Sequence, residues 1–88
     1  MFNLFFDYDE REIRRFEEGD LLVSTVMVTD SDKPFETAIA HQRYNSGGRI
    51  IVELYNNQYD AESGHEKWVG IITGDDLPDS IQDVSSHV

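Results

Sequence analysis

The sequence predicts an α+β fold, in which an antiparallel meander of three to four strands has one C-terminal helix packed on one face. Three features of the 88-residue chain lead to this prediction. Valine, isoleucine and threonine gather in short runs, two runs alternate in the period of a sheet, and residues 57–73 change to helical spacing. We assign residues 1–74 to a single domain and residues 75–88 to an acidic, loosely ordered C-terminal tail.

Three strands are predicted in the middle of the chain. Asp20–Thr29 is rich in the β-branched residues that suit a pleated strand. Asp30–Pro34 predicts a turn, because Asp and Ser side chains bond their own backbone and proline cannot extend a strand ladder. Phe35–His41 and Arg49–Tyr55 are the next two predicted strands, and Asn45–Gly48 between them contains residues that tolerate a positive φ.

Alternation along a strand predicts which side chains share a face of the sheet. It places Glu36 and Glu53 as cross-strand neighbours, on the face opposite the isoleucine and phenylalanine side chains. In the third of these strands, one face is expected to hold Ile50, Val52 and Leu54, and the other Ile51, Glu53 and Tyr55.

Residues 57–73 are predicted to form the helix. Asn57 is a favourable N-cap, and Asp60 follows it at the position of a capping-box carboxylate. Gly74 is expected to end the helix in a left-handed conformation, with Pro78 preventing its continuation. The stripe that should cover the sheet consists of Ala61, His65, Trp68 and Ile72.

The segment before residue 20 has two interpretations. Glu10–Phe16 fits a strand that pairs with the next one through Glu17–Asp20, a short turn with glycine where a positive φ is needed. It also fits a short helix, because Glu and Arg are good helix formers. We favour the strand, since a helix there would have only a thin apolar face.

Charge is the most unusual property of the chain: 18 acidic residues oppose 7 basic ones, for a formal net charge of -11. The acids gather at both ends, while residues 21–49 carry three acids and three bases. Such an excess opposes compaction, so it is better explained by binding or solubility. We predict that a basic partner protein is bound by Asp7, Asp9, Glu10, Glu17, Glu18, Asp20, Asp75, Asp76 and Asp79.

The same composition argues against several classes of function. An acidic surface is repelled by nucleic acid phosphates and anionic lipids. We therefore expect that the chain binds neither nucleic acid directly nor a membrane. The chain has no cysteine, which removes disulfides and thiolate metal sites and favours an intracellular setting. Its apolar start lacks a basic leader, so we expect no secretory signal.

Histidines and glutamates form the strongest candidate for a catalytic or metal site. His41 and His65 approach each other if the helix packs as predicted, and Glu36 or Glu53 would complete the site. A structural interpretation is favoured, because a histidine on an inner face usually bonds a backbone carbonyl or a neighbouring threonine. We therefore predict no catalytic residue, no cofactor, no metal ion and no enzyme.

A sheet covered by one helix has a second face that needs a partner. The apolar residues expected there predict a homodimer or a heterologous complex. The alternative is that the N-terminal residues Phe2, Leu4, Phe5, Phe6 and Phe16 cap this face within one chain. The possible oligomer face consists of Met27, Ala38, Ala40, Ile51 and Tyr55.

The chain also resembles a group of small tailed-bacteriophage proteins. The similarity lies in the Phe-Glu-Thr strand within Pro34–His41, the Tyr-ended strand Ile51–Tyr55, and the Gly-His and Trp pattern of the helix within Asp60–Val69. The resemblance covers roughly residues 20–73 and implies a viral origin and the cytoplasm of an infected bacterium. It carries over no catalytic residue, because such proteins are mostly without an assigned function.

Three hypotheses of function follow, in order of preference. The first is a non-enzymatic phage protein that binds a host or phage protein through its acidic surface and inhibits a host defence or nucleic-acid-binding enzyme, presenting a field like that of DNA. The second is an oligomer that sequesters a small anionic ligand, such as a nucleotide, with Arg11, Arg14, Arg15, Arg43 or Arg49. The third is a small enzyme that uses His65 with Glu36 or Glu53.

Overall fold

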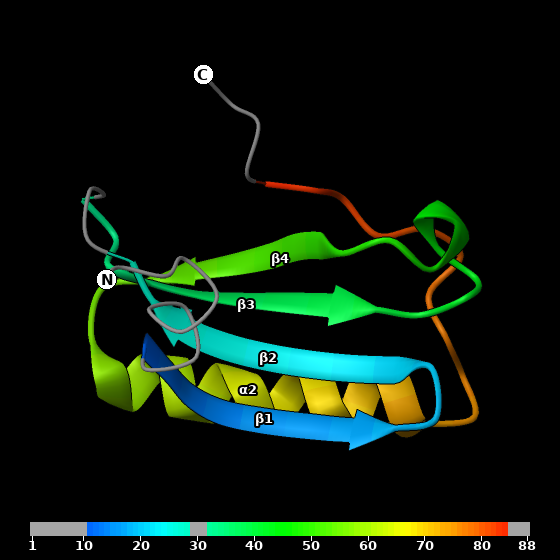
Figure 1. The fold of residues 1–88 in the computed structure, drawn as a ribbon, viewed down its shortest axis with the longest axis horizontal. Helices are drawn as coiled ribbons and strands as arrows, with labels where there is room; N and C mark the ends of the chain where they lie inside the picture. Colours follow the sequence, from blue (N-terminus) through cyan, green and yellow to red (C-terminus); the bar gives the residue numbers. More distant parts are fainter. Residues whose placement is uncertain (1–10, 29–31, 85–88) are drawn as a thin grey trace, which may run out of the picture.

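The structure is a computed structural model that describes residues 11–28 and 32–84. Within these residues a four-stranded antiparallel sheet has the order β1-β2-β3-β4, and the helix α2 lies across one of its faces (Figure 1). The predicted α+β meander is confirmed, with four strands. The elements are β1 (Glu12–Glu18), β2 (Leu21–Met27), β3 (Phe35–Ala40), the short 3-10 helix η1 (Asn45–Gly47), β4 (Ile50–Tyr55) and α2 (Gln58–Thr73).

Both predicted glycine turns adopt the backbone that their residues favour. The strand interpretation of the first segment is confirmed, and β1 joins β2 through a turn at Gly19, where φ is 60°. Between β3 and β4, Asn45, Ser46 and Gly47 have φ values of 49°, 53° and 86°, so the chain makes a left-handed turn. Asparagine and glycine tolerate this region, which is why the sequence indicates the turn.

A β-bulge in β4 corrects the predicted assignment of faces. Thr37 pairs with Glu53, but its neighbour Ala38 pairs with Ile51, so Val52 is an extra residue with no partner of its own. A bulge reverses the alternation from that point onward. The helix-covered face of β4 therefore holds Ile50, Val52, Glu53 and Tyr55, whereas Ile51 and Leu54 lie on the second face.

Three rows of side chains that each span three or four strands cross the helix-covered face of the sheet. Residues directly opposite on paired strands share a face, so the register defines the rows. The middle row is polar and lies between two rows that are mainly apolar. In order from β1 to β4, the rows are Phe16, Val23, Ile39 and Ile50; then Arg14, Thr25, Thr37 and Glu53; and, from β2 to β4, Met27, Phe35 and Tyr55.

The helix begins as predicted and ends differently. Asn57 is the N-cap, and its side-chain Oδ1 accepts a hydrogen bond from the backbone N–H of Asp60 at 2.8 Å. The left-handed conformation expected of Gly74 is wrong, because its φ of -76° and ψ of 170° are extended. Glycine suits this position for another reason: an added Cβ would lie 3.0 Å from the carbonyl oxygen of Gly70.

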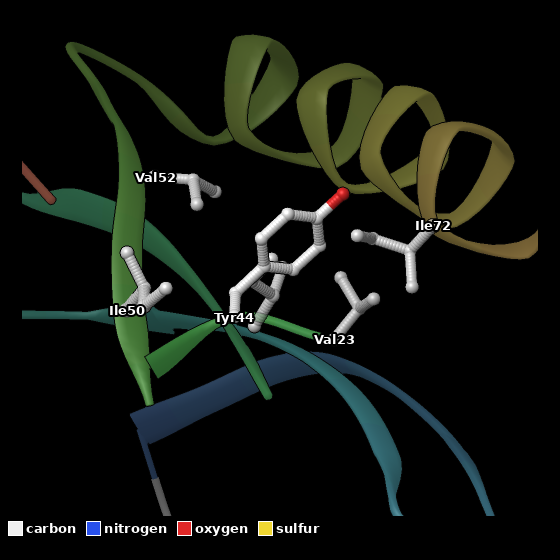
Figure 2. Packing of buried hydrophobic residues seen from close by; sticks show 6 residues of the cluster. Val23, Tyr44, Ile50, Val52 and Ile72 are labelled. Carbon is white, nitrogen blue, oxygen red and sulfur yellow. The ribbon is translucent and has the colours of Figure 1, made fainter. Parts of the chain in front are cut away.

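The main hydrophobic core lies between the sheet and the C-terminal half of α2. Figure 2 shows side chains of β2, β4 and the segment before η1 converging beneath the helix. Phe16, Leu21, Trp68, Val69 and Ile81 pack around this core. Each buried side chain of this size contributes roughly 1.5–3 kcal/mol. The core consists of Val23, Ile39, Tyr44, Ile50, Val52 and Ile72.

The part of the tail that the structure describes, residues 75–84, has no helix or strand but contacts the domain. The carbonyl of Pro78 accepts a hydrogen bond from the Tyr44 hydroxyl at 2.5 Å. The backbone N–H of Val84 donates to the carbonyl of Ile51 at 2.8 Å, at the β4 edge of the sheet. Among the described helices, none is long and apolar enough to cross a bilayer.

Candidate functional site

Acidic residues from two parts of the sequence lie at one end of the molecule. The turn between β1 and β2 and the segment after α2 are both at the right of Figure 1. They are held there by the core, because Phe16 and Leu21 beside the turn pack against the same cluster as Ile72 near the helix end. We call this surface the acidic end; its exposed residues are Glu17, Glu18, Asp20, Asp75, Asp76 and Asp79.

Most of the acidic end is not neutralised by nearby bases. Arg15 Nε lies 3.2 Å from Glu17 Oε1, and Arg43 lies 3.8 Å from Asp79 Oδ1. Within the described ranges, the remaining four carboxylates form no ion pair. These are Glu18, Asp20, Asp75 and Asp76.

Three other acids of the predicted binding surface, Asp7, Asp9 and Glu10, lie outside the described residues, so their position relative to the acidic end is not described. The sequence placed the acidic residues in two separate groups. Their approach at one end follows from the hairpin and the helix ending on the same side of the molecule.

A second candidate site is a line of polar side chains in contact with one another, which runs from α2 across the sheet to β4. His65 Nδ1 lies 2.8 Å from Thr25 Oγ1, which lies 2.6 Å from Thr37 Oγ1. The Tyr55 hydroxyl lies 3.0 Å from Thr37 Oγ1 and 3.4 Å from Glu53 Oε1. We call these five residues, His65, Thr25, Thr37, Tyr55 and Glu53, the polar line.

Glu53 ends the polar line in an ionised state that the helix stabilises. Burial raises the pKa of Glu53, but hydrogen bonds from Lys67 Nζ at 2.6 Å and Trp68 Nε1 at 2.8 Å outweigh it, so the pKa is lowered. At the other end of the polar row, Arg14 reaches Glu66 at 3.2 Å and Glu62 at 3.7 Å. The helix is thus held from both edges of the sheet.

Burial dominates the chemistry of the other two titratable groups in the polar line. It lowers the pKa of His65, which is 3 % exposed, and this favours the neutral imidazole. Burial also raises the pKa of Tyr55 to about 12, so its hydroxyl keeps its proton. At neutral pH the polar line therefore has its only charge at Glu53.

A shallow hollow of about 450 Å³ opens beside the Glu53 end of the polar line. Tyr55 and Gly64 form part of its wall, and the side chain of Lys67 borders it. The other residues that surround it are Leu54, Asn56, Asp60 and Ser63, so the hollow is lined mainly by polar groups.

The predicted histidine and glutamate site is not assembled. His41 Nδ1 accepts a hydrogen bond from the backbone N–H of Arg43 at 3.0 Å, whereas His65 bonds Thr25, as the structural interpretation predicted. Glu36 pairs with Leu54 on the second face, and Glu53 lies on the helix-covered face, so the predicted pairing of these glutamates is wrong. Among the described residues, no three His, Asp or Glu side chains come together as metal ligands.

Glu36 has a different environment on the second face. Burial raises its pKa, and the positive charge of Arg11 partly opposes this rise. The other predicted anion-binding arginines are dispersed: Arg14 lies on the helix-covered face, Arg15 pairs with Glu12 and Glu17, Arg43 pairs with Asp79, and Arg49 lies between η1 and β4. They do not form one pocket.

The predicted oligomer face does not form one surface. Met27 and Tyr55 share the helix-covered face with Phe35, so their assignment to the second face is wrong, as is that of Phe16. Tyr55 is buried, and Met27 is 41 % exposed at the end of β2. Ala38 and Ala40 are on the second face but already buried in one chain, and Ile51 is half-buried.

The other proposed caps of the second face, Phe2, Leu4, Phe5 and Phe6, lie outside the described residues. Self-association of the chain stays a prediction.

Sequence reasoning missed the role of four residues in or beside the polar line: Thr25, Thr37, Lys67 and Trp68. Thr25 and Thr37 indicate strands in the sequence pattern, but a threonine on the face that bears Phe35 and Ile39 also indicates a buried hydroxyl that needs a hydrogen-bond partner. Lys67 and Trp68 were not linked to Glu53, because without the bulge Glu53 points away from the helix.

Comparison of the chain with known protein families, curated protein sequences and solved structures gives no match. What the chain does is therefore inferred from its own geometry.

Proposed function

We propose that this chain is a non-enzymatic bacteriophage protein that binds a host protein through its acidic end. The partner is a protein with a basic surface, such as a defence or nucleic-acid-binding enzyme, which the chain inhibits by occupying the groove that accepts phosphates. The proposed setting is the cytoplasm of the infected bacterium, in keeping with the resemblance to tailed-bacteriophage proteins.

The observation that supports this proposal most directly is the meeting of two acidic segments, remote in sequence, at one end of the fold. Four of their carboxylates lack an ion pair among the described residues. Like charges brought together destabilise a folded chain, so their clustering needs a compensating role. A concentrated negative field steers a basic partner and raises the association rate at low salt.

The rigidity of the acidic end also favours binding. Its two segments adjoin Phe16, Leu21 and Ile72, which pack in the core, so the backbone on either side of the acidic end is anchored before a partner arrives. Preorganisation lowers the entropy that association costs. A flexible acidic tail of the same charge would lack this advantage.

The proposal is tested with two variants of equal net charge. One neutralises the four unpaired carboxylates of the acidic end: Glu18→Gln, Asp20→Asn, Asp75→Asn and Asp76→Asn. The control neutralises four carboxylates away from the acidic end, one in the β2–β3 connection and three on α2 between Asp60 and Glu66: Asp32→Asn, Asp60→Asn, Glu62→Gln and Glu66→Gln. Each variant removes four of the eleven net negative charges, which leaves -7.

Each chain is immobilised and exposed to nuclease-treated bacterial lysate at low salt. We expect the wild type and the control variant to retain the same basic nucleic-acid-binding protein, and the acidic-end variant to lose it. The captured protein is then loaded with labelled duplex DNA, which the wild-type chain should displace in a fluorescence anisotropy assay. Equal capture by all three chains, or no displacement of DNA, would contradict the proposal.

A further inference from the structure

The number of protons available along the polar line limits how many of its contacts are hydrogen bonds. From His65 to Glu53 the line has four contacts, and between its ends stand the hydroxyls of Thr25, Thr37 and Tyr55. Each hydroxyl has one proton and so donates one hydrogen bond. When Nδ1 of His65 has no proton, only the three hydroxyl protons are available for the four contacts. One contact is then without a hydrogen bond.

The distances identify the contact that has no hydrogen bond. The three contacts from Tyr55 to His65 measure 3.0, 2.6 and 2.8 Å, whereas Tyr55 and Glu53 are 3.4 Å apart, beyond the usual length of an O–H···O bond. All three hydroxyls therefore donate toward His65. Its Nδ1 accepts from Thr25, so the proton of the neutral imidazole is on Nε2.

We propose that the polar line is a reversible switch, in which protonation of His65 at Nδ1 turns all three hydroxyls toward Glu53. One N–H bond forms at Nδ1, with a proton taken from water. The hydroxyls of Thr25, Thr37 and Tyr55 rotate about their C–O bonds, and no O–H bond breaks. Tyr55 then donates to Oε1 of Glu53, and all four contacts hold a proton.

The switch connects a buried base to a carboxylate at the surface hollow. Glu53 already accepts hydrogen bonds from Lys67 and Trp68 and borders the hollow, whereas His65 is enclosed beneath the helix. Protonation of the imidazole thus changes the hydrogen bonding of Glu53 at the hollow, through hydroxyls on three strands. This inference does not depend on the function proposed for the acidic end.

Several charges act on His65 directly and must be separated from the switch. Glu66 on α2 and Glu12 on β1 raise its pKa, and Arg14 on β1 lowers it. Glu62 on α2 pairs with Arg14, and Lys67 neutralises Glu53 in part. These interactions act through space and do not require the hydroxyl of Tyr55, so a variant of Tyr55 distinguishes the two effects.

The test is nuclear magnetic resonance of the full chain. Above the ordinary histidine pKa of 6.5, the ring nitrogen shifts of His65 should show a proton on Nε2 and none on Nδ1. As the pH is lowered, the carboxyl carbon of Glu53 should show an extra inflection at the midpoint of His65. In Tyr55→Phe that inflection should be lost, because the line is interrupted.

Glu66→Gln is the matched control, since it removes a charge beside His65 but leaves the polar line intact. The midpoint of His65 should move to lower pH, while the inflection at Glu53 remains. If Tyr55→Phe does not fold, Thr37→Val interrupts the line at its centre and should likewise abolish the inflection. A proton on Nδ1 in the neutral wild type, or an inflection retained in a folded interrupted variant, would overturn the proposal.

Discussion

At Gly64 the helix lies directly on the hydroxyl of Tyr55. A Cβ added there would be 2.2 Å from the Tyr55 hydroxyl oxygen, far inside van der Waals contact. Because Tyr55 is buried and bonded to Thr37, it cannot move away freely. We predict that Gly64→Ala lowers the free energy of unfolding by about 1–3 kcal/mol, the usual cost of overpacking. Urea denaturation followed by circular dichroism measures the change.

Gly70 provides the matched control on the same helix. An added Cβ there has no atom within 4 Å, so alanine meets no obstacle. Gly70→Ala should raise the free energy of unfolding by up to about 1 kcal/mol through helix propensity alone. Equal effects of the two substitutions would show that Gly64 is not in close contact with Tyr55.

His65 gives the fold a dependence on pH. Burial lowers its pKa in the folded chain, so the unfolded chain takes up a proton at higher pH than the folded one. The stability due to neutral His65 is complete above the unfolded pKa of about 6.5 and is lost as the pH falls from there toward the folded pKa. His65→Gln should therefore lose less stability than the wild type when urea denaturation is repeated at about pH 8 and about pH 5.5. Identical losses would exclude a depressed pKa.

At the scale of elements, the start of α2 depends on the side chain of Asn57. Its Oδ1 satisfies the N–H of Asp60, which has no partner within the helix. We predict that Asn57→Ala lowers the free energy of unfolding by roughly 0.5–2 kcal/mol, whereas Asn57→Ser, a comparable cap, changes it by much less. Chemical denaturation of both variants measures this difference. An alanine variant as stable as the serine variant would show that the side chain of Asn57 does not stabilise the start of α2.

The elements were predictable where local chemistry decides them. The β-branched run of β2, the glycine turns and the cap of α2 each have a short-range cause, and each is found in the structure. The bulge at Val52 has no comparable signal, because it depends on how β4 meets β3 and α2. A shift of one residue moves every later side chain to the opposite face, so one unpredicted bulge misplaced both Glu53 and Tyr55.

For the whole molecule, the sequence predicts the net charge and the acidic segments but not how these segments lie in space. The sequence identifies Glu17, Glu18 and Asp20 as one acidic group and Asp75 and Asp76 as another. Their meeting depends on the lengths of β1 and α2, which both end at the same side of the fold. The polar line was hidden for the same reason, since its members come from three strands and a helix.

Binding of a basic partner by the acidic end should be visible in the ionic-strength dependence of association. Stopped-flow or surface plasmon resonance gives the association rate of the captured partner with the wild type, the acidic-end variant and the control variant of equal charge. If the acidic end binds the partner, the association rate falls steeply with salt for the wild type and the control, whereas the acidic-end variant associates more slowly and with a weaker dependence on salt. The same salt dependence in both variants would mean that net charge alone matters, and would contradict a binding site at the acidic end.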